Sequence, residues 1–221
     1  MRPSSPAAGP TARIIATLLL ALAAALPAAA DEAGDFDYFV LALSWSPSWC
    51  ATEGDGRGAP ECAPGAGLSF TLHGLWPQHE AGWPEFCATP ARDPSRRETA
   101  AMADIMGSGG LAWYQWRKHG RCTGLAGADY LALSRLAYEA VTIPPVLAAL
   151  DRDVRLPAAV VEVAFLEANP GLAPDGITVT CDDGRIDEVR ICLTRSLDPR
   201  FCGADVRRDC TLSGALMEAL R

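Results

Sequence analysis

Two short segments each place a histidine among residues that can carry out acid–base chemistry. Residues 70–78 read FTLHGLWPQ and contain His73, and residues 113–122 read WYQWRKHGRC and contain His119. Histidine gains and loses a proton near neutral pH, because its unperturbed pKa is about 6.5. Two histidines in one site can therefore act together as general acid and general base. The whole chain has only three histidines, which makes these two candidates for an active site.

The second segment predicts a helix whose polar side chains converge. Gln115 and His119 are four residues apart and share a helical face, and Lys118 is adjacent to His119. A lysine next to a histidine lowers the pKa of the imidazolium, and it can also hold a phosphoryl group as negative charge builds up in a transition state. The alternative interpretation is a solvated basic helix end, which the helix dipole favours.

The first segment predicts a strand that leads into a histidine. Residues 68–72 have a strand pattern, and Gly74 follows His73. We therefore expect the ring of His73 to project from the end of a strand, where the backbone turns, into the wall of a cleft. A structural histidine that is hydrogen-bonded in the core would fit the same pattern. The third histidine, His79, lies in a loop and is interpreted as a surface residue.

Strand patterns lie near both ends of the chain, with helical patterns between them. Besides residues 68–72, strands are predicted at 36–46 and, as a hairpin around Asp183-Gly184, at 177–182 and 185–194. Helices are predicted at 97–106, at 111–119, at 129–141 with Asp129 as N-cap, and at 157–168. This order indicates an α+β domain, with a central antiparallel sheet and helices packed around it.

The first 30 residues have the pattern of a secretory signal peptide. Arg2 and Arg13 accompany an apolar run at 14–26, which is shorter than the ~20 residues that a membrane helix needs. Small residues end the segment, so we expect cleavage near Ala30, export to the periplasm or the medium, and one catalytic domain at 31–221. An uncleaved membrane anchor is the alternative. No later segment predicts a membrane helix.

The exported protein is expected to be acidic. Loss of Arg2 and Arg13 takes the 19 basic residues to 17 against 27 acidic ones, so the formal charge changes from −8 to −10. Proteins that hold nucleic acid through broad phosphate neutralisation carry basic faces, so this charge argues against that class. It leaves open an enzyme that acts on RNA in a local cleft.

The cysteine count indicates disulfides. An even number in an exported chain is typical of a disulfide framework, and four bridges are expected. Structural zinc is the rival interpretation, but the set contains no Cys-x-x-Cys pair. Spacing alone cannot choose among the 105 pairings that eight cysteines allow. All eight follow the predicted signal peptide: Cys50, Cys62, Cys87, Cys122, Cys181, Cys192, Cys202 and Cys210.

Both histidine segments closely resemble the active-site segments of the ribonuclease T2 family. The matching residues are FTLHGLWP at 70–77 and WRKHGRC at 116–122, in the family's order, and residues 37–50 resemble its first strand. The resemblance implies an enzyme that cleaves single-stranded RNA without a metal or cofactor. In that reaction the ribose 2′-hydroxyl attacks the adjacent phosphate, the 5′-oxygen leaves, and a 2′,3′-cyclic phosphate forms.

The resemblance also implies roles for individual residues. His119 is similar to the general base, His73 to the general acid, and Lys118 to the residue that stabilises the phosphorane. Trp76 matches a position that stacks on a nucleobase, although a core tryptophan is the alternative. Because an indole face suits any nucleobase, broad base tolerance is expected. Gln78 stands where some members carry an acidic residue that reads adenine, so the base preference stays open.

The chain departs from the family at two adjacent positions. Many members carry a His-Glu pair where this chain has Tyr114 and Gln115. Either side chain can donate a hydrogen bond to a phosphoryl oxygen, but neither can shuttle a proton near neutral pH. We therefore expect that cleavage survives, with Gln115 in the catalytic set and Tyr114 binding substrate, and that hydrolysis of the cyclic intermediate is slow.

Disulfide pairing is also implied by the resemblance. It pairs Cys87 with Cys122, which would tie the two histidine segments together and limit the loss of catalytic geometry. The remaining implied pairs are Cys50 with Cys62, and Cys181 with Cys210 around Cys192 with Cys202.

The leading hypothesis is an exported, monomeric endoribonuclease that acts on single-stranded RNA and has no membrane partner. A catalytically weakened RNA-binding or toxin-like protein on the same scaffold is the alternative, because Tyr114 and Gln115 replace two groups that the family often uses. A metal-dependent phosphodiesterase is a third possibility, which would need clustered carboxylates and histidines that the two segments do not supply.

Overall fold

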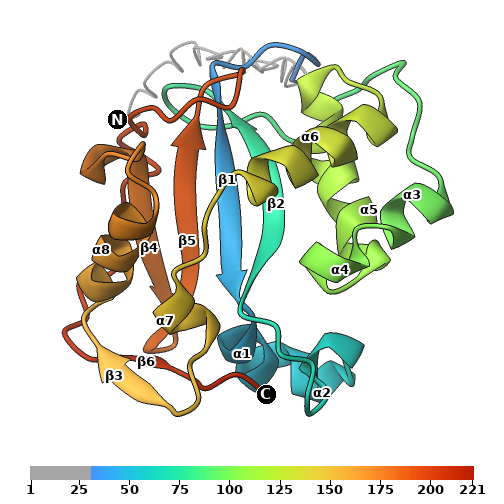
Figure 1. The fold of residues 1–221 in the computed structure, drawn as a ribbon. Coiled ribbons are helices and arrows are strands. Elements are labelled where there is room, and N and C mark those ends of the chain that lie inside the picture. The colour runs from blue at the N-terminus through green and yellow to red at the C-terminus, as the bar shows by residue number, and fades with distance from the viewer. Residues whose placement is uncertain (1–30) are drawn as a thin grey trace, which may run out of the picture.

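Six strands form one sheet in the computed structural model, which describes residues 31–221 (Figure 1). The predicted signal peptide lies outside the described residues. The strands are β1 (Tyr38–Trp45), β2 (Phe70–Gln78), β3 (Val154–Leu156), β4 (Ile177–Asp182), β5 (Arg185–Leu193) and β6 (Ala215–Met217).

The sheet is mixed, with antiparallel pairing at every strand pair except one. Its order is β2-β1-β5-β6-β3, and β4 also pairs with β5. The parallel pair is β5 with β6, which meet at Arg185 and Leu216. The predicted hairpin is confirmed, because Asp183 and Gly184 between β4 and β5 both have positive φ, as such a tight turn requires.

Most of the helical residues lie between β2 and β4 in the sequence, so the predicted α+β class is confirmed. Figure 1 shows α3 to α6 gathered beside β2, and α8 beside β4. The helices are α1 (Ser46–Trp49), α2 (Asp55–Arg57), α3 (Arg96–Ala100), α4 (Ala103–Met106), α5 (Gly109–Lys118), α6 (Gly127–Glu139), α7 (Pro145–Ala148) and α8 (Ala158–Ala168). Single turns occur at Cys50–Gly54, Pro60–Cys62, Gly120–Thr123 and Pro174–Gly176.

The prediction of a single helix at residues 97–106 is wrong, because the chain forms two short helices there. Arg135 of α6 donates a hydrogen bond of 2.8 Å to the carbonyl oxygen of Ala101. That oxygen would otherwise accept the next helical hydrogen bond, and Ile105 N–H instead bonds to Met102. The helix therefore ends after α3 and restarts as α4.

The sequence predicted Asp129 as the N-cap of α6, and this prediction is wrong. The helix begins earlier, at Gly127, with Ala126 in the capping position. Gly127 fits there because a side chain would collide with Pro94, whose nearest atom lies 2.2 Å from an ideal Cβ. Asp129 lies in the first turn, where its negative charge still interacts favourably with the helix dipole.

The two faces of the sheet carry different side chains. Leu41 and Leu43 of β1 pack into the main core with Leu72 and Leu75 of β2, against the helices. On the other face, Val40 belongs to a smaller cluster that includes Trp76 and the cysteines of the 192–202 disulfide. This alternation follows from the two-residue period of a strand. The second face therefore has fewer apolar side chains and room for polar ones.

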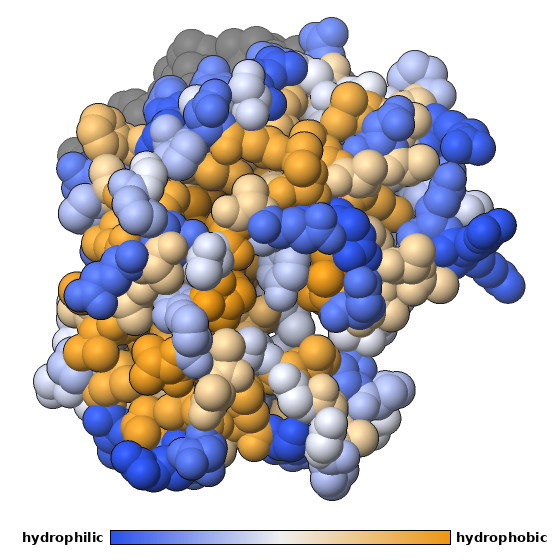
Figure 2. Space-filling view, viewed as in Figure 1, coloured by the Kyte–Doolittle hydropathy of each residue, from blue (hydrophilic) through white to orange (hydrophobic). Residues whose placement is uncertain are grey.

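The helical side of the molecule also leaves apolar residues at the surface. Figure 2 shows hydrophobic residues spread over this side, and the exposed ones include Leu136, Val146, Val160 and Val163, from α6, α7 and α8. Among the described residues, the helices are too short or too polar to cross a membrane.

Four disulfides link the chain between residues 31 and 221. They join Cys50 to Cys62, Cys87 to Cys122, Cys181 to Cys210 and Cys192 to Cys202, which are the pairs that the family resemblance implies. Phe86 N–H also donates to the carbonyl of Lys118 at 2.8 Å, next to the Cys87–Cys122 bridge. The loop that follows β2 is thus fastened to the end of α5.

Candidate active site

The sequence predicted His73 at the end of a strand, and this prediction is wrong. His73 lies within β2, at a β-bulge. Ala42 of β1 is opposite Gly74 and the next residue, Leu43, is opposite Leu72, so β2 has one extra residue at this point. The strand continues to Gln78. A bulge bends a strand and re-aims a side chain, and bulges are common next to active sites.

Side chains from β2 and β5 meet on the sheet face opposite the main core. His73 and Trp76 come from β2, and Glu188 and Arg190 come from β5. The β5 pair alternates with Val189 and Ile191, which belong to the main core. The strand period therefore directs Glu188 and Arg190 towards the histidine.

The last turn of α5 supplies the other polar groups. This helix ends at Lys118, and His119 is its C-cap residue. The chain turns here because Gly120 leaves room for Trp116 and Tyr130, whose rings lie 2.5 and 2.7 Å from an ideal Cβ at that position. His119 is consequently held at the end of the helix, only 6% exposed.

One cavity of about 370 Å³ brings together all the predicted catalytic and substrate-binding residues. It is lined by His73, Trp76, Gln78, Tyr114, Gln115, Lys118 and His119, together with Val40, Trp83, Arg190, Asp205 and Val206. A second cavity of about 700 Å³ adjoins it and shares His73, Trp76, Tyr114 and Arg190. The two cavities therefore meet at the first histidine.

His73 is bound to a buried carboxylate. Its Nδ1 contacts Oε1 of Glu188, and Oε2 of Glu188 accepts hydrogen bonds from Nε and Nη2 of Arg190 at 2.9 and 2.7 Å. Burial opposes ionisation of Glu188, but the hydrogen bond with His73 and the charges of His73 and Arg190 lower its pKa to about 2. Glu188 is therefore ionised at any pH above about 3.

His119 is held in the neutral form. Burial, together with the positive charges of Lys118 and His73, lowers its pKa to about 3. Its ring stacks on Trp76, with centroids 5.2 Å apart and planes inclined at 28°, and its Nδ1 is buried without a hydrogen-bond partner. The two histidines thus occupy opposite electrostatic environments.

Trp76 links β2 to α5 through a hydrogen bond. Its Nε1–H donates to Oε1 of Gln115 at 2.8 Å. An indole N–H can only donate, so the oxygen of the amide must face Trp76 and the NH₂ group is left for another partner. The bond passes over Gly74, where an ideal Cβ would lie 2.4 Å from Nε1 and 2.5 Å from Oε1.

The remaining predicted residues differ in exposure. Nζ of Lys118 lies 3.5 Å from Oε2 of Glu85. Tyr114 is 48% exposed at the edge of the cavity. Gln78 is buried, and its amide donates to the carbonyl of Pro77 at 3.0 Å. His79 lies outside the cavity, and its Nδ1 is 4.0 Å from Oδ2 of Asp37.

Of the residues of this site that the sequence analysis missed, Glu188, Arg190 and Trp83 could have been found from a signal in the sequence. Glu188 and Arg190 interrupt the otherwise mainly apolar strand IDEVRICL two residues apart, which is a signal that both face one polar environment. Trp83 lines the cavity while 54% exposed. An exposed tryptophan beside a polar cavity is a suitable surface for stacking.

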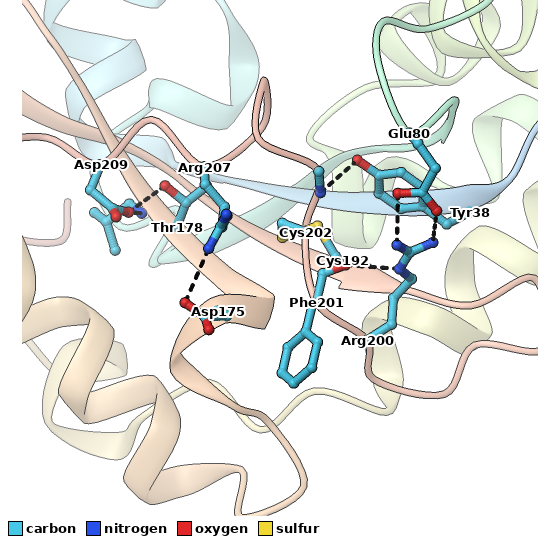
Figure 3. Close-up of a disulfide and its surroundings, with 12 residues drawn as sticks. Tyr38, Glu80, Asp175, Thr178, Cys192, Arg200, Phe201, Cys202, Arg207 and Asp209 are labelled. Carbon is cyan, nitrogen blue, oxygen red and sulfur yellow. Dashed lines mark hydrogen bonds and ion pairs between the residues drawn. A yellow bond between two sulfur atoms is a disulfide. The ribbon is translucent and has the colours of Figure 1, made fainter.

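A C-terminal loop completes the wall of the cavity, and a disulfide fastens it to β5. Figure 3 shows the Cys192–Cys202 bridge, with Arg200 reaching Glu80 beside Tyr38. Arg200 donates to both carboxylate oxygens of Glu80, at 2.9 and 3.0 Å. Further along, Asp205 lines the cavity and accepts a hydrogen bond of 2.6 Å from Gly82 N–H. The C-terminal loop thereby holds the segment just before Trp83 at two points.

No group of three or more His, Cys, Asp or Glu within residues 31–221 is arranged to hold a metal ion. The polar groups of the cavity are two imidazoles, an ammonium, a guanidinium, two amides, a phenol, a carboxylate and two indole N–H groups.

The fold and the site together define a disulfide-linked α+β protein whose cleft is lined by two histidines. The family model for the ribonuclease T2 family matches residues 36–202. This chain therefore belongs to the ribonuclease T2 family.

Individual relatives agree with this assignment. A ribonuclease of Aeromonas hydrophila is 41% identical over 106 residues, which cover 48% of this chain and 46% of the relative. Ribonuclease I of Escherichia coli is 29% identical over 149 residues, covering 50% of this chain and 56% of the relative. The matched part spans about half the length of these curated relatives.

Solved structures share the fold. The RNase-related protein from Calystegia sepium has a TM-score of 0.63 at 20% identity, covering 84% of this chain and 97% of that one. RNase NT, in complex with 5′-AMP, has a TM-score of 0.60 at 21% identity, covering 84% of this chain and 98% of that one.

Proposed function

We propose that this protein is an exported endoribonuclease that cleaves single-stranded RNA by transphosphorylation and leaves 2′,3′-cyclic phosphate ends. The observation that carries the proposal is the pair of histidines in one cavity, one held neutral and the other bound to an ionised carboxylate. A reaction that needs a base and an acid at the same moment requires this opposite pairing.

His119 is the base in this proposal. Its pKa of about 3 keeps the ring neutral across the physiological range, so it can accept the proton of the ribose 2′-hydroxyl. His73 is the acid that protonates the leaving 5′-oxygen. Membership of the T2 family and the position of both residues in its two motifs support the same division.

Lys118 and Gln115 stabilise the crowded phosphorane. The ammonium of Lys118 supplies positive charge to the equatorial oxygens, and the free NH₂ group of Gln115 donates a hydrogen bond. Because Tyr114 and Gln115 do not exchange protons near neutral pH, hydrolysis of the cyclic product is slow. Gln115 also shares its oxygen with Trp76, which fixes the direction in which the amide donates.

Nucleobases bind by stacking in this proposal. Trp76 and Trp83 line the same cavity, and an aromatic face accepts any base at ~1–3 kcal/mol per stacked base. Gln78 is buried with its amide on a backbone carbonyl, which favours broad base tolerance. The enzyme acts as a monomer, without a metal or cofactor, in the periplasm or the medium, and its four disulfides suit an oxidising compartment.

A timed digestion of a defined single-stranded RNA in excess chelator tests the proposal, with cyclic and linear ends resolved. The wild type and the control His79→Ala should produce cyclic ends, and His73→Ala and His119→Ala should lose at least ~10²-fold in rate. Loss of wild-type activity on adding chelator would indicate the metal-dependent alternative. Wild-type protein that binds the RNA without cleaving it, at every pH from acidic to neutral, would indicate the weakened binding protein.

A further inference from the structure

Glu188 is a buried charge with every carboxylate oxygen in use. It is 4% exposed, and its Oε1 contacts His73 while its Oε2 accepts two hydrogen bonds from Arg190. Moving a carboxylate out of water costs several kcal/mol unless partners compensate. Arg190 engages only Oε2, so the other oxygen of the carboxylate is directed at His73.

We infer that Glu188 is the positioning residue for the acid step, holding the imidazole of His73 so that Nε2 carries the proton delivered to the leaving 5′-oxygen. This inference rests on the proposed function. Its basis is the contact between Nδ1 of His73 and the carboxylate, which leaves Nε2 as the ring nitrogen without a protein partner.

The carboxylate determines which nitrogen of His73 is protonated. An ionised carboxylate can only accept, so Nδ1 must carry a hydrogen when it contacts Glu188. In the doubly protonated ring the second proton is then on Nε2, and that is the one available for transfer. The ring lies where the two cavities meet, with a side-chain exposure of 34%, so a leaving group in the adjoining cavity can reach it.

Arg190 fixes the carboxylate in turn. Its guanidinium binds Glu188 through two nitrogens and lies 5.4 Å from the centroid of the Trp76 ring. Both hydrogen bonds end on Oε2 and fix the position of that oxygen, and the contact of Oε1 with His73 fixes the other end of the carboxylate. The orientation of His73 is thus coupled, through two side chains, to the rigid strand β5.

The charged groups that line the two cavities with His73 come from several elements. They are Glu188, Arg190 and Asp187 on β5, Lys118 and His119 at the end of α5, and Glu53, Arg57, Glu61 and Asp205 from the surrounding segments. Asp187 lines the adjoining cavity, and its pKa is raised to about 6 by burial and by the charge of Glu188. Glu218 lines neither cavity, and its carboxylate is bound by Arg185 and Ser48, which makes it a matched control.

The step balances without any further reactant. His119 takes the proton of the 2′-hydroxyl, the 2′-oxygen forms its bond to phosphorus, and the bond from phosphorus to the 5′-oxygen breaks. The proton on Nε2 of His73 goes to the departing oxygen, which leaves as a 5′-hydroxyl. Glu188 keeps its charge throughout and bonds to Nδ1 before and after the transfer.

The test compares leaving groups. A dinucleoside monophosphate expels an alkoxide and needs an acid, whereas a nucleoside 3′-(4-nitrophenyl phosphate) expels a phenolate that is stable without one. Glu188→Gln should lose about 10- to 100-fold in kcat on the dinucleotide, part of the ~10²–10⁴ that general acid catalysis supplies, and under about 3-fold on the aryl ester. His73→Ala should show the same selectivity with a larger loss, and Glu218→Gln should change either rate by less than about 3-fold.

Equal losses on the two substrates in Glu188→Gln would overturn the inference while leaving the proposed function in place. A wild type that cleaves neither substrate would overturn both. A readout that does not depend on the variant is the ¹⁵N NMR spectrum of His73 in the wild-type protein. We expect the neutral ring to carry its hydrogen on Nδ1, and a hydrogen on Nε2 would contradict the inference even if Glu188→Gln failed to fold.

Discussion

The low pKa of His119 should make the stability of the fold depend on pH in a specific window. In the unfolded chain this histidine has a pKa of about 6.5, and in the folded protein burial and neighbouring charges lower it to about 3. Between these values the unfolded state binds a proton that the folded state does not. Stability from this group is therefore complete above about pH 7 and is lost as the pH falls from 6.5 towards 3.

The expected size follows from the linkage relation. From pH 7 to pH 4.5 the group should remove about 2.5 kcal/mol from the free energy of unfolding, since one pKa unit corresponds to about 1.4 kcal/mol. The value at pH 4.5 changes by only ~0.1 kcal/mol if the folded pKa is 4 instead of 3, because about three quarters of the folded protein would still have a neutral His119 at that pH. A loss of this size is a large fraction of a typical stability of ~5–15 kcal/mol.

His119→Phe isolates this contribution. Phenylalanine keeps an aromatic ring against Trp76 but cannot bind a proton, so its variant should lose about 2.5 kcal/mol less than the wild type between pH 7 and pH 4.5. Urea unfolding at both values measures this difference, and unfolding at pH 7 and pH 8 gives the internal control, where the two proteins should change in parallel. Equal losses in both proteins between pH 7 and pH 4.5 would refute the argument that burial keeps this histidine neutral.

Two further predictions concern how the site is held together. Gly74→Ala should break the hydrogen bond between Trp76 and Gln115 and lower kcat/KM at least ~10-fold, because the added Cβ lies within 2.5 Å of both groups. The control is Gly214→Ala, where nothing lies within 4 Å of the added Cβ, and it should leave kcat/KM unchanged. Matching kinetics in the two variants would contradict the role given to Gly74. Replacing Cys87 and Cys122 by serine should lower the free energy of unfolding by about 4 kcal/mol, because the bridge closes a 35-residue loop in the unfolded chain. Urea unfolding of the variant and the wild type measures this difference. A change below ~1 kcal/mol would show that the loop is held without the bridge.

Much of the fold was predictable because its signals are local. The Asp183-Gly184 turn between two apolar runs specifies a hairpin, and strands at the ends with helices between them specify the α+β class. The cleft could be anticipated as well, since the resemblance of two motifs indicated His73 and His119 together. The predictions failed where a distant side chain decided the outcome, as when Arg135 takes the carbonyl of Ala101 and divides one predicted helix into two.

Site residues outside the two motifs could not be found in this way. Glu188 is 115 residues away from His73 in the sequence, and its contact depends on how β5 pairs with β1 and β1 with β2. Strand registers of this kind are set by the packing of the whole core, which no short segment encodes. The bulge at His73 was missed for the same reason, because an extra residue in one strand is defined only by its partner.

The bulge in β2 affects the distance between the rings of His73 and His119. His73 belongs to the sheet and His119 to the end of α5, so the two histidines are held by different elements. Gly74 follows the extra residue of the bulge and lies beneath the hydrogen bond between Trp76 and Gln115, which joins β2 to α5. The separation of the two rings therefore depends on how closely α5 approaches β2 at Gly74. A glycine between the two histidine segments, without any polar side chain of its own, helps to set the width of the cleft.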